Sequence, residues 1–179
     1  LKEKVLIDNP KGATQPLFSP DGKEIAYIEG RMTLRVLNLE SGKSRTVLTK
    51  KELFANGEND QYFSWSPDGR WILFDYAVPG IAPGEVGLVA ADGKSPAVNL
   101  TESGFNDGRA RWVLDGKAML WFSNRDGLNS VAQGGASQSD AYAMFLAREA
   151  GDRFRLSKED FALLKEEEEK KAKEKDKDK

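Results

Sequence analysis

Short segments in which apolar and polar residues alternate, separated by turns rich in Gly and Pro, occupy most of residues 13–155. Residues 24–28, 71–76 and 118–122 have the period of two that a half-buried β-strand requires, and each segment directly follows an Asp-Gly turn. A segment ending in an aromatic residue precedes every one of these turns. The pattern therefore predicts three β-hairpins.

The hairpin turns recur at a constant spacing. Phe-Ser-Pro-Asp-Gly-Lys at 18–23 returns as Trp-Ser-Pro-Asp-Gly-Arg at 65–70 and, degraded, as Trp-Val-Leu-Asp-Gly-Lys at 112–117, which places the three aspartates 47 residues apart. Asn-Asp pairs at 59–60 and 106–107 keep the same spacing. We therefore interpret the chain as a repeat protein. The residues expected to build the turns are Pro20, Asp21, Gly22, Pro67, Asp68, Gly69, Asp115 and Gly116.

Each repeat also contains signals for further strands. A third strand is expected at 33–39, 85–90 and 141–148, and a Gly turn then leads to a fourth strand at 45–48 and 96–100. Four short antiparallel strands about every 40 to 50 residues are typical of one blade of a β-propeller. The predicted fold is all-β: a partial β-propeller of about three four-stranded antiparallel blades. Their expected ranges are 13–50, 59–101 and 106–155, with residues 4–8 as a candidate last strand of a preceding blade.

Residues 156–179 are expected to form a separate appendage. From Lys165 onward every residue except Ala172 is Lys, Glu or Asp. Ser157 lies three residues before Asp160, close to a capping box, so a short helix is predicted to begin there and to run into a charged linker. The alternative is a charged arm that binds a partner.

Composition removes several classes of function. The 179 residues include no Cys and no His, which excludes disulfides, thiolate or imidazole zinc sites, and any Ser-His-Asp or Cys-His mechanism within the chain. The 27 basic and 29 acidic residues nearly cancel, so neither a nucleic acid nor a membrane is an expected partner. We expect no cofactor, no metal and no catalytic residue. A propeller enzyme that acts through paired carboxylates is a further hypothesis.

Three blades are fewer than the roughly four to eight that close a propeller ring. The sequence opens on Leu1 without a charged start and an apolar stretch. We therefore expect this chain to be an arc of a larger propeller, or one that another segment or subunit, in a homo-oligomer for example, completes.

Polar residues near the start of the third repeat form the candidate binding site. Two guanidiniums on one side of an inner strand could hold a peptide carboxylate in a bidentate manner. The alternatives are a lattice of salt bridges with neighbouring acids, simple solvation, or capping of the strand entry by the Asn-Asp pair. The variable loops, including a long insertion between residues 125 and 140, are expected together on one face of the blades, opposite the Pro-Asp-Gly turns. The candidate peptide-binding residues are Asn106, Asp107, Arg109, Arg111 and Arg125.

At its Ser-Pro-Asp-Gly hairpins the sequence resembles the WD40-like propeller repeats of the TolB translocation protein, prolyl-oligopeptidase-type enzymes and tricorn-type serine peptidases. The third repeat distinguishes among these three families. It carries Trp-Phe-Ser-Asn-Arg-Asp-Gly at 121–127, Ala-Tyr-Ala-Met-Phe at 141–145 and Leu-Ser-Lys-Glu-Asp-Phe at 156–161 before the Lys/Glu run. The arrangement is similar to the propeller region of bacterial tricorn-type peptidase homologues.

This resemblance implies a non-catalytic segment that gates or binds peptide substrates and scaffolds a serine peptidase. In that family the propellers precede a PDZ module and a protease core, so the implied partners are the rest of the propeller, the core and peptides. No residue matches the catalytic motifs of the family. A TolB-like interaction propeller with no protease attached is the alternative. The resemblance favours the periplasm, with the cytoplasm as the other option.

Overall fold

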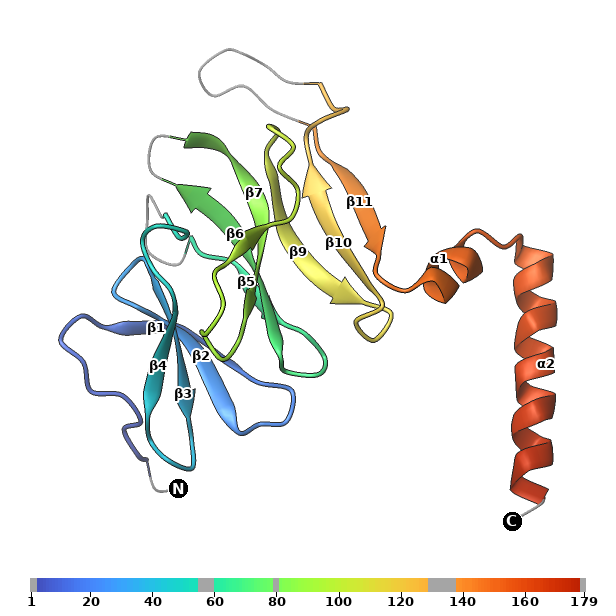
Figure 1. Cartoon of the computed structure of the whole chain (residues 1–179), viewed down its shortest axis with the longest axis horizontal. Coiled ribbons are helices and arrows are strands. Elements are labelled where there is room, and N and C mark those ends of the chain that lie inside the picture. The colour runs from blue at the N-terminus through green and yellow to red at the C-terminus, as the bar shows by residue number, and fades with distance from the viewer. Residues whose placement is uncertain (1–2, 55–59, 79–80, 129–137, 178–179) are drawn as a thin grey trace. The chain divides into compact units, whose positions relative to one another are not determined.

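The computed structural model describes residues 3–54, 60–78, 81–128 and 138–177. Its β-strands form three sheets, which follow one another along the chain like the three repeats (Figure 1). We name these sheets the first, second and third blades. The all-β partial propeller predicted from the sequence is confirmed.

Strand order within each blade equals chain order, and the paired strands are antiparallel. The first blade consists of β1 (Ala13–Phe18), β2 (Glu24–Glu29), β3 (Thr33–Asn38) and β4 (Ser44–Leu48). The second consists of β5 (Phe63–Trp65), β6 (Trp71–Val78), β7 (Ile81–Ala90) and β8 (Val98–Asn99). The third consists of β9 (Asp107–Val113), β10 (Ala118–Ser123) and β11 (Asp140–Phe145).

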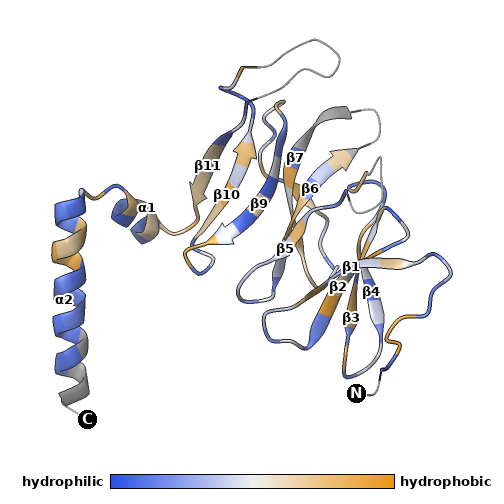
Figure 2. Ribbon diagram, turned by 180° about the vertical axis from the view of Figure 1, so that it is seen from behind, coloured by the Kyte–Doolittle hydropathy of each residue, from blue (hydrophilic) through white to orange (hydrophobic). Residues whose placement is uncertain are grey.

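Apolar side chains fill the spaces between neighbouring blades. Ile72 and Phe74 of β6 pack with Ile28 of the first blade, whereas Leu73 packs with Met119 of the third. Successive residues of β6 thus point to opposite faces, as a pleated strand requires, and all three are fully buried. Figure 2 shows hydrophobic residues on the strands and a largely hydrophilic C-terminal helix. The middle blade is therefore the central layer of the fold.

Polar contacts also join the first two blades. The Arg45 guanidinium holds the Glu24 carboxylate through two 2.6 Å hydrogen bonds, and its Nε donates to the carbonyl of Ala91 at 2.9 Å. The Trp65 indole N–H donates to the carbonyl of Leu17 at 3.2 Å. These bonds satisfy polar groups at the edges of the interface.

The first two hairpin turns share one hydrogen-bonding scheme. Ser19 Oγ donates to Asp21 and accepts from the N–H of Glu24, and the N–H of Gly22 donates to the Ser19 carbonyl. Gly22 has a φ of +71°, which glycine adopts without strain. Ser66, Asp68 and Gly69 repeat these contacts at the second turn.

The third turn is built differently because it lacks the Ser-Pro pair. Leu114 and Asp115 have φ values of +52° and +53°, and the N–H of Gly116 donates to the Val113 carbonyl at 3.2 Å. With Gly116 at +81°, three successive residues of positive φ turn the chain within the four-residue loop 114–117, which joins the paired residues Val113 and Ala118. The Asp-Gly pair therefore keeps the hairpin although the Pro is lost.

The end of the third blade departs from the sequence interpretation. A strand was expected over residues 141–148, but β11 ends at Phe145, and α1 (Arg148–Phe154) occupies residues that were assigned to the blade. Among the described residues the third blade has three strands rather than four. The helix carries Glu149 in its first turn and Arg153 in its last, as the helix dipole favours.

The chain divides into two compact units, Leu1–Met144 and Phe145–Lys179. In the second unit α2 (Lys158–Lys177) begins at the predicted cap, where Ser157 Oγ accepts from the N–H of Asp160 at 3.1 Å. The helix runs farther into the charged region than predicted, because Glu and Lys favour helix and pair at i, i+4. No helix among the described residues is long and apolar enough to span a bilayer.

Candidate functional site

The loops that join the second strand of a blade to the third, and one blade to the next, emerge at the end of the sheets opposite the hairpin turns (Figure 1). We call this end the loop face. Asn106 and Asp107 lie where the chain enters β9, and Arg125 follows β10, so the structure brings these three predicted residues together there.

Asp107 and Arg125 form a largely buried ion pair. Asp107 Oδ2 accepts hydrogen bonds from Arg125 Nη2 at 2.9 Å and from Ser103 Oγ at 2.8 Å, and the Asp107 side chain is completely buried. Arg125 Nε also donates to Ser123 Oγ at 3.0 Å, and its guanidinium lies 4.5 Å from the centre of the Tyr142 ring. These contacts commit Arg125 to the structure of the blade, which leaves it poorly suited to bind a peptide.

Asn106 caps the strand entry. Its N–H donates to Asn124 Oδ1 at 2.9 Å, and its own side-chain oxygen accepts from the N–H of Gly84 at 3.3 Å. The capping alternative therefore accounts for the contacts of Asn106.

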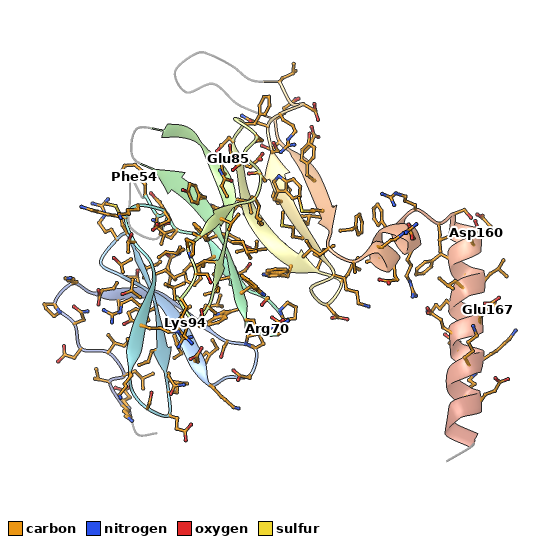
Figure 3. All side chains as sticks on the ribbon, in the orientation of Figure 1. Phe54, Arg70, Glu85, Lys94, Asp160 and Glu167 are labelled. Atoms are coloured by element: carbon orange, nitrogen blue, oxygen red, sulfur yellow. The ribbon has the colours of Figure 1, made fainter. Side chains whose placement is uncertain are left out.

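Glu85, in the middle of β7, is a site residue that sequence reasoning missed (Figure 3). Its Oε1 accepts from the N–H of Gly104 at 2.9 Å, and its Oε2 accepts from the N–H of Ser103 at 3.1 Å and from the Thr101 hydroxyl. One carboxylate thus fixes the connection between the second and third blades. The sequence signal that could have identified Glu85 is its position as the single acid at the start of the apolar segment 85–90.

Arg109 sits in a β-bulge. Phe122 pairs with Gly108 and Leu120 pairs with Arg111, so two residues of β9 lie opposite Trp121 alone. The first of them, Arg109, has a φ of +58°. Bulges of this kind usually place glycine at that position. The simple alternation that was expected from Arg109 to Arg111 is therefore interrupted.

Asp75 of β6 holds the bulge in place. Its Oδ1 accepts a 2.7 Å hydrogen bond from the N–H of Arg109, and a side chain on Gly108 would crowd the carboxylate at 3.2 Å. Burial raises the pKa of Asp75 from 3.8 to about 6, against the lowering effects of the Arg109 N–H and guanidinium. The second blade therefore carries, at Asp75, a carboxyl group that is much harder to ionise than that of an exposed aspartate.

This pKa predicts how stability changes with pH. Since the pKa is raised in the folded state, ionisation of Asp75 costs no stability below about pH 4, and the cost grows as the pH rises through about 6. Asp75→Asn keeps the oxygen that accepts from Arg109 but cannot ionise. We expect this variant to gain about 1–2 kcal/mol at pH 7.5 and almost nothing at pH 4, because partial solvent access reduces the full ~1.4 kcal/mol per pKa unit.

Urea unfolding of both proteins across this pH range measures the difference. Asp92→Asn, which changes an exposed acid in a turn, is the matched control and should leave the pH dependence unchanged. An equal gain at pH 4 and pH 7.5 would show that Asp75 is not the titrating group.

The repeat places related residues on the inner strands or directly before them. Gln15, Tyr62 and Arg109 are spaced 47 residues apart. Gln15 lies in a bulge like that of Arg109, with a φ of +52°, and its Nε2 donates to the carbonyl of Gln61 at 2.7 Å. The Arg109 guanidinium lies 5.7 Å from the centre of the Tyr62 ring. Applying the 47-residue spacing to Arg109 would have found Tyr62 from the sequence.

Arg109 and Arg111 differ from the arginines that are paired with acids. Both side chains are exposed, with buried Ala110 between them, and neither makes an ion pair with a described residue. Arg35, Arg45 and Arg125, in contrast, each bind a carboxylate. The inner strand of the third blade thus carries two exposed cations, and the Tyr62 ring lies beside the first of them.

Residues 129–137, most of the predicted long insertion, lie outside the described residues. Among those described, no group of three or more acidic side chains is placed to hold a metal ion.

Comparison with solved structures finds the tricorn protease, with a TM-score of 0.59 and 16% identity over 79% of this chain and 14% of that chain. A TolB protein from Agrobacterium tumefaciens has a TM-score of 0.49 and 23% identity over 72% of this chain and 44% of its own. Oligogalacturonate lyase in complex with manganese has a TM-score of 0.30 and 12% identity over 66% of this chain and 48% of its own. All three are β-propeller proteins.

The likeness to the tricorn protease confirms the predicted resemblance to a propeller region at the level of the fold. This chain spans a small part of that protease and less than half of each of the other two proteins. No protein-family model and no curated protein matches the sequence.

Proposed function

We propose that this chain is a non-catalytic β-propeller segment of a tricorn-type serine peptidase, and that it binds the carboxylate end of peptides at Arg109 and Arg111. The observation that carries the proposal is the pair of exposed guanidiniums, both without an ion pair to a described residue, on the inner strand of the third blade. Inner strands border the central channel of a propeller, so a peptide held there would be guided along the axis. The likeness of fold to the tricorn protease supports this assignment.

A TolB-like interaction propeller with no protease attached is the second candidate. The same inner-strand site would then bind a carboxylate of a protein partner. The coding sequence downstream of Lys179 distinguishes the two. A PDZ module and a serine-peptidase core there would support the peptidase assignment, and their absence would contradict it.

Peptide binding is tested by the fluorescence anisotropy of a labelled peptide and of the same peptide with an amidated C-terminus. Hydrogen bonds to a charged group contribute about 1.5–3 kcal/mol, so amidation or Arg111→Gln should weaken binding about tenfold or more. Arg111 serves as the test position because no described residue forms an ion pair with it.

Arg70→Gln is the matched control, since Arg70 is an exposed arginine on a hairpin turn away from the loop face. This variant should bind the peptide as tightly as the natural protein. Equal affinity for the acid and the amide would contradict the carboxylate site.

A further inference from the structure

The third blade ends on a strand edge without a neighbour. In this blade β10 lies between β9 and β11, so the outer edge of β11 has no partner strand among the described residues. The first two blades carry β4 and β8 at the corresponding position. An open edge presents unpaired N–H and C=O groups, which favour the addition of another strand.

The described residues after β11 form no strand that fills this edge. Five residues separate β3 from β4, and seven separate β7 from β8. Only two residues separate β11 from α1, and most of the described residues beyond that point are helical. The described residues that follow β11 therefore supply no fourth strand to the third blade.

Residues 4–8 have the properties of such a strand. Lys4 and Val5 lie two repeat lengths before β8, the outer strand of the second blade. The segment Lys-Val-Leu-Ile-Asp is rich in residues that favour strands. Yet it pairs with no sheet, and Val5 and Leu6 remain 77% and 50% exposed. Within the part of the chain that the structure describes, there is thus a strand-like segment without a sheet and a sheet without an outer strand.

We propose that residues 4–8 of one copy of this chain pair with the outer edge of β11 in a second copy. The exchange is reciprocal, so each copy completes the third blade of the other. Two copies supply six blades, which lies within the roughly four to eight that close a propeller. Closure at two copies also avoids the open-ended assembly that a non-closing head-to-tail contact would produce. This inference goes beyond peptide binding and can fail independently of it.

The first test is the oligomeric state of the full chain, measured by light scattering after size-exclusion chromatography. We expect a mass about twice the 19.8 kDa of one chain. Leu6→Asp should convert the dimer to a monomer, because it places a charge within the added strand. A far-UV circular dichroism spectrum that the substitution leaves unchanged would show that the blades remain folded. A natural protein that stays monomeric, or a dimer that persists in Leu6→Asp, would overturn the proposal.

The second test uses the fact that the chain contains no cysteine. A copy carrying Leu6→Cys is mixed with a differently tagged copy that carries one cysteine on β11, and disulfide-linked pairs are counted. Facing residues of paired strands lie close enough to cross-link, whereas their immediate neighbours point to the other face. The β11 positions for the substitutions are Asp140, Ala141, Ala143 and Met144.

Cross-linking should therefore be strong at either the odd-numbered or the even-numbered positions and weak at the others. Lys43→Cys, in the exposed turn between β3 and β4, is the control and should cross-link poorly with Leu6→Cys. A uniform yield across the four β11 positions, or a yield no higher than the control, would contradict strand pairing. Pairing that requires some other polypeptide would give this same negative result with the purified chain.

Discussion

Replacing Phe74 with alanine is expected to lower the free energy of unfolding by about 3–5 kcal/mol, the usual range for a buried phenylalanine. The Phe74 side chain is fully buried in the core that joins the first and second blades. Its ring lies over Gly87 on the neighbouring strand, where an added methyl group would approach the ring to 2.4 Å. Because residue 87 is glycine, the space above its backbone is filled by the Phe74 ring. Removing the ring opens a cavity that nearby side chains cannot easily fill.

Urea denaturation followed by tryptophan fluorescence measures this change. Phe18→Ala is the matched control, because the Phe18 side chain is 60% exposed, and it should cost less than about 1 kcal/mol. Similar losses for the two variants would show that the blades do not pack through the face of β6 that carries Phe74.

The hairpins could be predicted because their determinants are local. A Pro-Asp-Gly turn sets its own backbone angles, and the side chain of Ser19 or Ser66 completes the turn within six residues. The blade fold could then be inferred from the 47-residue spacing, since a single small sheet cannot bury its apolar face without a neighbour.

The end of the third blade could not be predicted from the same pattern. Ala-Tyr-Ala-Met-Phe at 141–145 alternates weakly and continues without Gly or Pro into Arg148. The helix α1 starts there because Arg148, Glu149 and Ala150 are good helix formers. Whether such a segment becomes strand or helix depends on the presence of a partner strand, which local sequence does not report.

The candidate site was predicted in part. Its residues cluster where the repeat spacing put them, but sequence could not tell a paired arginine from an exposed one. Arg125 lies beside buried Asp107, whereas the bulge at Arg109 shifts the register of β9 and turns a backbone N–H toward Asp75. Bulges at residues other than glycine leave no reliable trace in an alternating pattern.

Arg125→Met is expected to lower the free energy of unfolding by about 3 kcal/mol, the lower end of the range for breaking a buried ion pair. The reason is the carboxylate left behind. Asp107 is completely buried, and without Arg125 the Ser103 hydroxyl would be the one remaining donor to its Oδ2 among the residues that the structure describes. About a quarter of the Arg125 side chain is exposed, so water can partly replace the guanidinium, which places the loss at the lower end.

A double-mutant cycle with Asp107→Asn separates the unpaired charge from lost packing. If the unpaired carboxylate causes the loss, Arg125→Met should cost much less when it is combined with Asp107→Asn, because no buried charge then remains. Arg70→Met, which breaks the exposed pair with Asp68, is the control and should change stability by less than about 1 kcal/mol. An equal loss with and without Asp107→Asn would mean that Arg125 acts through its contact with the Tyr142 ring rather than through its charge.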